Sequence, residues 1–378
     1  AEDKRERHGK KMGILEKIKD IETEIARTQK NKATEYHIGL LKARLAKLRA
    51  TLLEPKAGAG AGKGEGFEVT KSGDARVALI GFPSVGKSTI LSELTETHSE
   101  AASYEFTTLT CIPGIIHYKG AEIQLLDMPG IIQGAAEGRG RGKQVIAAAR
   151  NADLILMMMD ATKGDTQRRL LEHELEEVGI RLNTRPPNIY LKINPGGGLA
   201  FNSTVQLTNM NERMVRDILK EYKVHNAEVL FREDATVDQF IDVIEKKNRY
   251  YINCLYVYNK IDQITIEEVD YLARLPDSFV ISCEMNLNLD MLLEKIWEYL
   301  DLIRIYTKRP REKPNFEDPL IIRRNSTILD VCRSVHREFE LQFKHALVWG
   351  ASAKHIPQKI GLSHELYDED VVQLFKKI

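Results

Sequence analysis

Runs of consecutive apolar residues alternate with segments of helical apolar spacing through the middle of the chain. An unbroken apolar run is typical of a strand buried on both faces, and strands that alternate with helices are typical of a parallel sheet. The pattern therefore predicts an α/β fold with a mostly parallel sheet. Strands are expected at 75–80, 120–126, 152–161, 253–258 and 279–284, the last including a loop, and a helix at 168–178.

Residues 13–54 instead repeat apolar side chains at helical spacing, with a break at Lys30, Asn31 and Lys32. This spacing predicts a helix-turn-helix over 12–54 in which each helix has one apolar stripe. From Lys30 to Arg49 the segment has six basic residues and one acidic residue. That imbalance fits either a contact face for nucleic acid or the ribosome, or a solvated helical face.

Changes in composition divide the rest of the chain. Residues 1–11 are expected to be a flexible leader, and 55–67 a linker rich in Gly, Ala and Lys. The stretch 179–247 is too long for a loop, so an α+β subdomain is expected there, inserted between two parts of the sheet domain, 68–178 and 248–301. Residues 302–378 are expected to form a small separate domain. Within these last regions we expect strands at 201–207, 303–307, 346–350 and 370–375, and helices at 211–222 and 327–343.

Composition indicates the cellular compartment of the protein but does not identify its binding partner. Hydrophobic residues make up 43% of the chain, and 55 basic residues balance 55 acidic ones, so global charge indicates no polyanionic partner. The four cysteines are scattered without metal-binding spacing, which favours a reduced compartment. No signal peptide opens the chain and the longest apolar run, 154–159, is too short to span a bilayer. We therefore expect a cytoplasmic location.

The strand expected at 75–80 runs directly into a glycine-rich turn with the pattern GxxxxGK[ST]. Two glycines let the backbone curl so that successive amides point at one spot beside a helix N-terminus, which suits a polyphosphate. Lys87 would reach the β- and γ-phosphates, and the Ser88 hydroxyl would bind Mg²⁺. The predicted phosphate-binding residues are Gly81, Phe82, Pro83, Ser84, Val85, Gly86, Lys87, Ser88 and Thr89.

A second motif follows the next strand. Asp127 ends that strand and Gly130 comes three residues later, as a γ-phosphate sensor requires: the carboxylate orders Mg²⁺ through water and the glycine amide faces the phosphate. A threonine from the earlier segment 104–108 would complete the metal shell only while the γ-phosphate is present. Spacing does not separate Thr107 from Thr108, and we favour Thr108. The predicted metal ligands are thus Ser88, Thr108 and Asp127, and the predicted catalytic residues Lys87, Thr108 and Gly130.

The apolar run at 253–258 ends in Asn259, Lys260 and, two residues on, Asp262. A carboxylate can accept hydrogen bonds from both N1–H and the exocyclic amine of guanine, a donor pair that adenine lacks on that edge. This motif therefore predicts a preference for GTP over ATP. Ser282 and Cys283 follow the last strand, where backbone amides could donate to the guanine carbonyl oxygen.

The stretches GFPSVGKST, YEFTT, DMPGI, NKID and HELYDEDVV resemble the Obg-related GTPases, specifically the developmentally regulated GTP-binding proteins. The segments MGILEKI and IARTQKNKAT are similar to the second of that family's two eukaryotic branches. The resemblance implies an N-terminal helix-turn-helix, a G domain, an insertion like ribosomal protein S5 domain 2, and a C-terminal ubiquitin-like TGS domain of β-grasp fold. It also implies a factor on translating ribosomes with a partner from the family's dedicated regulatory-protein class.

Two further features bear on mechanism. Ile131 follows the γ-phosphate sensor where Ras-like switches have a water-orienting Gln, so slow intrinsic hydrolysis is expected. The family resembles other GTPases with a hydrophobic residue there, some of which use K⁺ with an Asn in the phosphate loop. Ser84 stands at that position, so K⁺ stimulation is an open prediction. The basic stretch 138–143 fits either a mobile loop that binds phosphates or a glycine hinge with solvated charges.

Together these motifs predict a switch that binds GTP and Mg²⁺, hydrolyses GTP to GDP and phosphate, and acts on translating ribosomes. The alternative is a scaffold for ribosomes or RNA that uses GTP mainly as a structural cofactor, for which Ile131 is the argument. A role in membrane traffic is the weakest hypothesis, because the sequence has no lipidation motif and no stable membrane association is expected.

Overall fold

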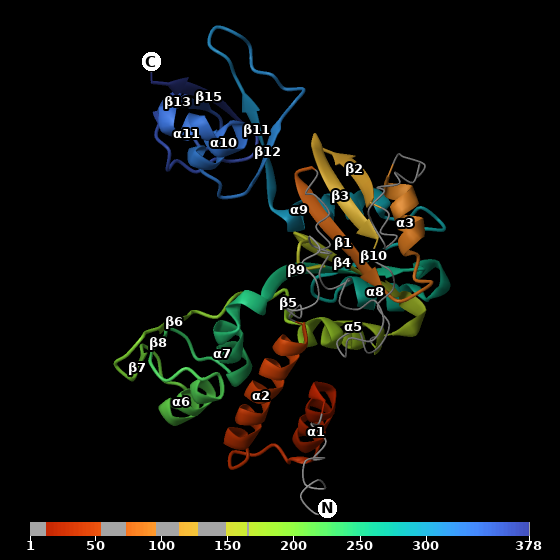
Figure 1. The fold of residues 1–378 in the computed structure, drawn as a ribbon. Helices are drawn as coiled ribbons and strands as arrows, with labels where there is room; N and C mark the ends of the chain where they lie inside the picture. The colour runs from red at the N-terminus through yellow and green to blue at the C-terminus, as the bar shows by residue number, and fades with distance from the viewer. Residues whose placement is uncertain (1–12, 54–72, 96–112, 128–148, 165, 378) are drawn as a thin grey trace, which may run out of the picture. The chain divides into compact units, whose positions relative to one another are not determined.

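The structure of the 378-residue chain is a computed structural model that describes residues 13–53, 73–95, 113–127, 149–164 and 166–377 (Figure 1). The chain forms two compact units. One contains 1–66, 132–150 and 169–252, and the other contains 67–131, 151–168 and 253–378. Within the described ranges, no helix is both long enough and apolar enough to cross a membrane.

The second unit contains a sheet with the strand order β10-β9-β4-β1-β3-β2. All neighbours are parallel except β2, which runs antiparallel to β3. The chain moves from β1 to β3 on one side and to β4 on the other, and such a reversal of strand order is where α/β sheets bind ligands, outside the carboxyl ends of the strands. The strands are β1 (Ala75–Gly81), β2 (Pro113–Tyr118), β3 (Ala121–Asp127), β4 (Leu154–Asp160), β9 (Tyr250–Asn259) and β10 (Ser278–Val280).

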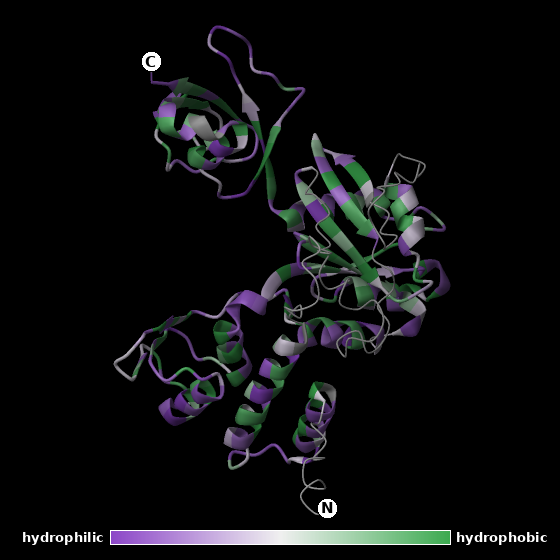
Figure 2. Ribbon diagram, in the orientation of Figure 1, coloured by the Kyte–Doolittle hydropathy of each residue, from purple (hydrophilic) through white to green (hydrophobic). Residues whose placement is uncertain are grey.

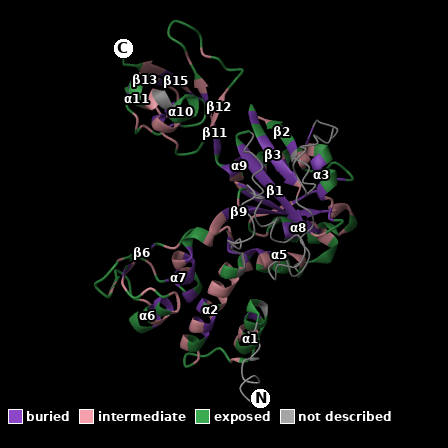
Figure 3. Cartoon of the chain, in the orientation of Figure 1, coloured by how far each residue is buried: buried purple, intermediate pink, exposed green. Residues whose placement is uncertain are grey.

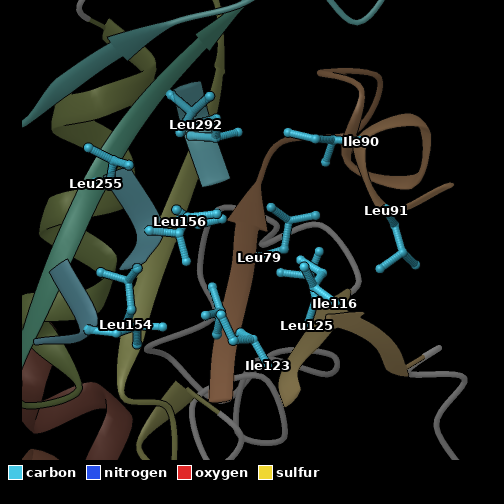
Figure 4. Packing of buried hydrophobic residues seen from close by; sticks show 14 of the residues in the cluster. Leu79, Ile90, Leu91, Ile116, Ile123, Leu125, Leu154, Leu156, Leu255 and Leu292 are labelled. Carbon is cyan, nitrogen blue, oxygen red and sulfur yellow. The ribbon is translucent and has the colours of Figure 1, made fainter. Parts of the chain in front are cut away.

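The core of this sheet explains the apolar runs of the sequence. Every residue of β1 and of β4 is buried (Figure 3), as expected for strands covered on both faces, and most of these residues are hydrophobic (Figure 2). On one face Leu79, Leu125 and Leu156 pack with Ile90 of α3 and Leu292 of α9 (Figure 4). The predicted parallel sheet is thus confirmed. The helices are α3 (Lys87–Leu94), α8 (Ile266–Ala273) and α9 (Leu289–Leu300), with short 3-10 turns η2 (Ala161–Lys163) and η4 (Ile261–Gln263).

The C-terminal part of the second unit has its own five-stranded sheet, in the order β12-β11-β15-β13-β14, and its own core. The single helix predicted at 327–343 is wrong: it is two helices, because His336 has extended backbone (φ −171°, ψ 136°). The bend lets Phe339 pack against the core that contains Phe343. The elements are β11 (Leu302–Thr307), β12 (Leu320–Arg323), α10 (Ile328–Val335), α11 (Arg337–Gln342), β13 (Phe343–Trp349), β14 (Gln358–Ile360) and β15 (Asp370–Lys376).

The first unit contains a three-stranded sheet, β6-β8-β7, that packs against α6 and α7 around Phe231 and Phe240. The expected helix at 211–222 is present as α6, and Asn211 caps its N-terminus, with its side chain accepting from the Met214 amide. β7 begins and ends earlier than the strand expected at 201–207. The elements are α5 (Thr166–Glu177), β5 (Ile180–Leu182), β6 (Ile189–Ile193), β7 (Leu199–Ser203), α6 (Glu212–Glu221), β8 (Ala227–Phe231), α7 (Val237–Ile244) and η3 (Lys246–Asn248); α5 starts in the other unit, and β5 pairs with the first residues of β9.

The predicted helical hairpin is present as α1 (Ile14–Arg27) and α2 (Glu35–Leu53). The expectation of one apolar stripe fails for α2, which contacts α6 and α7 as well as α1. Ala43 of α2 is fully buried in the core that it shares with those two helices. An added Cβ on Gly39 would come within 3.2 Å of Met214, so α2 and α6 approach closely at this position.

Of the six basic residues at 30–49, the four that lie in α2 have partners within their own unit. These partners are acidic side chains or a carbonyl oxygen. Lys30 and Lys32 are exposed. The four residues of α2 therefore hold this helix against α1, α5, α6 and α7. The contacts are Lys42 with Asp238, Arg44 with Glu221, Lys47 with the carbonyl oxygen of Glu221, and Arg49 with Glu22 and Glu177.

Candidate functional site

The glycine-rich turn between β1 and α3 is shaped by two close approaches. An added Cβ on Gly81 would lie 2.5 Å from the Met158 carbonyl oxygen, and one on Gly86 would lie 2.3 Å from the Asn259 amide nitrogen. Gly86 also has φ +96°, and Ser84, at φ +64°, is left-handed without being glycine. Only glycine fits at 81 and 86, so the spacing of the sequence motif follows from the packing of this turn.

Lys87 begins α3 and folds back over the turn. Its Nζ donates to the carbonyl oxygens of Gly81 at 3.1 Å and Phe82 at 2.9 Å, and the residue is 8% exposed. Burial lowers the pKa of Lys87, while the nearby charge of Asp127 opposes that shift. A cation at the centre of a backbone loop is the arrangement that attracts phosphate oxygens.

Ser88 and Asp127 bring two oxygen ligands together from different elements. The Ser88 hydroxyl, in the first turn of α3, donates to Oδ2 of Asp127 at the end of β3 over 3.2 Å. Burial raises the pKa of Asp127, although Lys87 and Ser88 oppose the shift. Oδ1 of Asp127 is buried and has no hydrogen-bond partner among the described residues. Because Mg²⁺ prefers few protein ligands, all of them oxygens, a hydroxyl beside an incompletely satisfied carboxylate fits this ion.

Asn259 joins the two halves of the site. It ends β9 and is 3% exposed, and its Nδ2 donates to the Val85 carbonyl oxygen at 2.9 Å. Its Oδ1 accepts from the backbone amides of Lys260 at 2.8 Å and Cys283 at 3.1 Å. One amide side chain therefore fixes the glycine-rich turn, the loop after β9 and the loop after β10 at the same place.

Asp262 lies in η4 and is held by the loop after β10. The Ser282 hydroxyl donates to Asp262 Oδ1 at 2.6 Å and accepts from the Met285 amide at 3.2 Å. Ser282 is fully buried, and Cys283 is 7% exposed, with its pKa raised by burial. Asp262 itself is half-buried, so part of its carboxylate is accessible to a ligand.

One residue of this site was missed by sequence reasoning. Asp160 ends β4 directly opposite Asn259 of β9, and its Oδ2 accepts from Lys260 Nζ at 2.8 Å. Burial raises the pKa of Asp160, but hydrogen bonds from Lys260 and Thr162 outweigh burial, so its pKa lies below the ordinary value. The available signal was an acidic residue that closes a run of six apolar ones.

The structure therefore gathers most of the predicted site residues at the carboxyl edge of one sheet. Those in the glycine-rich turn and first turn of α3 (81–89) lie beside Asp127, Asn259, Lys260, Asp262, Ser282 and Cys283, all in the second unit. Several of the predicted features lie outside the described residues: Thr107, Thr108, Gly130, Ile131 and the basic stretch 138–143.

Comparison with known proteins identifies the class. Residues 76–193 match the family described as 50S ribosome-binding GTPase, residues 196–302 match the C-terminal region of MMR_HSR1 domain, and residues 303–376 match the TGS domain. Together with the glycine-rich turn at the edge of a parallel sheet, these matches make the chain a P-loop GTPase with a C-terminal TGS domain.

Full-length relatives then give the family. Developmentally-regulated GTP-binding protein 2 of Homo sapiens is 67% identical over 366 residues, which cover 97% of this chain and 100% of that protein. The Mus musculus protein of the same name is also 67% identical, and the Dictyostelium discoideum homologue is 63% identical, with the same coverage of both chains. The chain belongs to the developmentally regulated GTP-binding protein family, as its motifs predicted.

Proposed function

We propose that the protein is a Mg²⁺-dependent switch that hydrolyses GTP slowly on its own and acts on translating ribosomes. The observation that carries the nucleotide part is the bond from Asn259 to the Val85 carbonyl oxygen. It places the motif that would read the base against the turn that would hold the phosphates, so that one nucleotide can contact both. A guanine-binding motif remote from the phosphate loop would not support this role.

The residues have separate tasks in this proposal. Lys87 and the amides of the turn hold the phosphates, and Asp262, oriented by Ser282, accepts two hydrogen bonds from guanine. Ser88 and Asp127 would hold Mg²⁺, which when bound neutralises charge on the phosphate oxygens. Thr108 and Gly130 are proposed to respond to the γ-phosphate, and Ile131 is the reason to expect slow hydrolysis.

The ribosome part of the proposal is supported by family membership. Residues 76–193 match a family described as 50S ribosome-binding GTPase. The six basic residues of 30–49 give this role little independent support, because four of them bind within their own unit. We also propose a cytoplasmic location and a partner from the family's regulatory-protein class. The domain boundaries proposed from the sequence, with an S5 domain 2-like insertion at 179–247, remain part of this proposal.

Two measurements test the nucleotide and hydrolysis parts. Isothermal titration with GTP and ATP should show tight binding of GTP only, and tight binding of ATP would end this proposal. Single-turnover hydrolysis should be slow alone and faster with ribosomes. Running it in K⁺ and in Na⁺ tests stimulation by K⁺, which stays a prediction because Ser84 replaces the usual Asn.

A scaffold that uses GTP as a structural cofactor is the second candidate, and Ile131 favours it. The same single-turnover assay separates the two candidates, because a scaffold would hydrolyse GTP at one slow rate under every condition. Ribosome pelleting with bound GDP or a non-hydrolysable GTP analogue gives an independent reading. A switch should pellet with one nucleotide more than with the other, whereas a scaffold should not.

A further inference from the structure

Asp160 is an almost fully buried charge with a complete set of partners. Its side chain is 5% exposed, and it stands at the carboxyl end of β4, in register with Asn259 of β9. Oδ1 accepts from the Thr162 amide at 3.0 Å and the Thr162 hydroxyl at 2.7 Å. Its backbone amide donates to Gln167 at 3.3 Å. A carboxylate buried this deeply is stable only when its oxygens are hydrogen-bonded.

The remaining carboxylate oxygen of Asp160, Oδ2, accepts a hydrogen bond from the ammonium group of Lys260. Lys260 Nζ donates to Asp160 Oδ2 at 2.8 Å. Asp160 directly precedes η2 and Lys260 directly precedes η4, and these two short turns contact each other. Lys260 has left-handed backbone, φ +67°, and its amide is held by Asn259. Both ends of this lysine are therefore fixed within the loop.

Fixing Lys260 matters because of where it stands. In the sequence it lies between Asn259, which donates a hydrogen bond to the glycine-rich turn, and Asp262, which accepts one from Ser282. A free lysine has many rotamers, and a ligand that must order them loses affinity. The ion pair removes that freedom before any ligand arrives. The carboxylate also offsets the positive charge of the lysine, which weakens its attraction for phosphate.

We propose that Asp160 is a positioning residue for the nucleoside end of the guanine-nucleotide site, acting through Lys260. This rests on the proposed assignment of Asn259, Lys260 and Asp262 to the base. Asp160 holds the lysine in the conformation that the nucleoside meets, and it has no part in binding phosphates. It therefore contributes equally to the affinity for GDP and for GTP, and it lies outside the sequence motifs for phosphate, metal and base.

The variant Asp160→Asn tests this with little change of shape, because an amide oxygen can still accept from Thr162. Dissociation of fluorescent GDP and of a fluorescent non-hydrolysable GTP analogue should both become about tenfold faster, the effect of losing one charge-assisted hydrogen bond. Asp290→Asn, an exposed acidic residue in the first turn of α9, is the matched control and should leave both rates unchanged. Unchanged rates in Asp160→Asn would overturn the proposal.

A double-mutant cycle separates positioning from general stability. The affinity for GDP is measured by equilibrium titration, a method that also measures weak binding. The variants are Asp160→Asn, Lys260→Met and the double variant. If Asp160 acts through Lys260, Asp160→Asn costs less than twofold in affinity once Lys260 is Met. An equal loss in both backgrounds would show that Asp160 only supports the fold, and would overturn the proposal.

A third arm separates this proposal from the assignment on which it rests. Asp262→Asn should weaken GDP binding whatever Asp160 does. If Asp262→Asn weakens binding and Asp160→Asn does not, only the positioning role fails. If Asp262→Asn leaves GDP affinity unchanged, the base assignment itself fails.

Discussion

The side-chain amide of Asn259 donates to the main-chain carbonyl of Val85 at 2.9 Å, across 174 residues of sequence. This bond joins the loop after β9 to the turn after β1, and the same side chain accepts from the Cys283 amide. A site for a nucleotide needs its base-reading and phosphate-binding parts at a fixed separation. Asn259 sets that separation with one buried side chain.

Removal of this amide should therefore weaken nucleotide binding. We expect Asn259→Ala to lower the affinity for GDP at least about tenfold, since a hydrogen bond is lost and the Val85 carbonyl oxygen is left without it. Asn253→Ala is the matched control: Asn253 is on the same strand and donates to the Tyr299 carbonyl oxygen at 3.3 Å. Isothermal titration of both variants checks this, and equal losses of affinity would contradict the role given to Asn259.

Gly86 is the position in the glycine-rich turn that has least space for a side chain. Alanine there meets both an unfavourable φ of +96° and the Asn259 amide at 2.3 Å. Gly197 has a similar φ, +100°, with open space around it. We expect Gly197→Ala to cost about 1 kcal/mol of stability and leave nucleotide binding intact. Gly86→Ala should abolish detectable GDP binding, because the clash displaces the turn. Retention of GDP by Gly86→Ala would show that the turn is not held by Asn259.

The role proposed for Ser88 is tested by removing the metal. Ser88→Ala should speed GDP dissociation in Mg²⁺ by about tenfold, because one oxygen ligand is lost. In excess EDTA the wild type and the variant should release GDP at the same rate. Ser92→Ala removes a hydroxyl from the same helix, one that donates to the Ser88 carbonyl oxygen, and should match the wild type in both buffers. A difference between Ser88→Ala and wild type that persists in EDTA would exclude a metal-linked role.

Arg49 should act on stability. It contacts Glu22 and Glu177, and its side chain is 20% exposed. Burial raises the pKa of Glu177, and Arg49 opposes that shift, so removing the arginine leaves a half-buried carboxylate without its main partner. We expect Arg49→Ala to destabilise its unit by about 1–3 kcal/mol, measured by thermal unfolding. Lys32→Ala, at an exposed position, should have no effect. If instead Arg49→Ala weakened ribosome pelleting without changing stability, the basic run would be a contact face.

These cases show which parts of the molecule could be predicted from sequence. The fully buried strands β1 and β4 could be predicted from their apolar runs, and the glycine-rich turn could be predicted from its motif. Both signals are local in the sequence. The partners of Arg44 and Arg49 could not be predicted, since Glu221 and Glu177 follow them by 177 and 128 residues. Local charge counts treat such side chains as unpaired, and only the tertiary structure shows their partners.

Two further misses have physical reasons. The apolar positions of 327–343 fit one helix, but extended backbone at His336 divides it, and the change of direction lets Phe339 reach its core. From the sequence, Asp160 was predicted only as part of the buried strand at 152–161. Its functional interest comes from Lys260, 100 residues later, which the parallel pairing of β4 with β9 brings beside it.

In the proposed site, Asp262 is the residue that distinguishes guanine from other bases. Asparagine has the same shape, and its amide can accept from N1–H of xanthine and donate to the C2 oxygen, but it cannot accept both donors of guanine. Equilibrium titration of wild type and Asp262→Asn with GDP and with xanthosine diphosphate tests this directly. We predict that the wild type prefers GDP and that the variant prefers xanthosine diphosphate. If the variant kept its GDP affinity and gained none for xanthosine diphosphate, Asp262 would not contact the base and the account would be wrong.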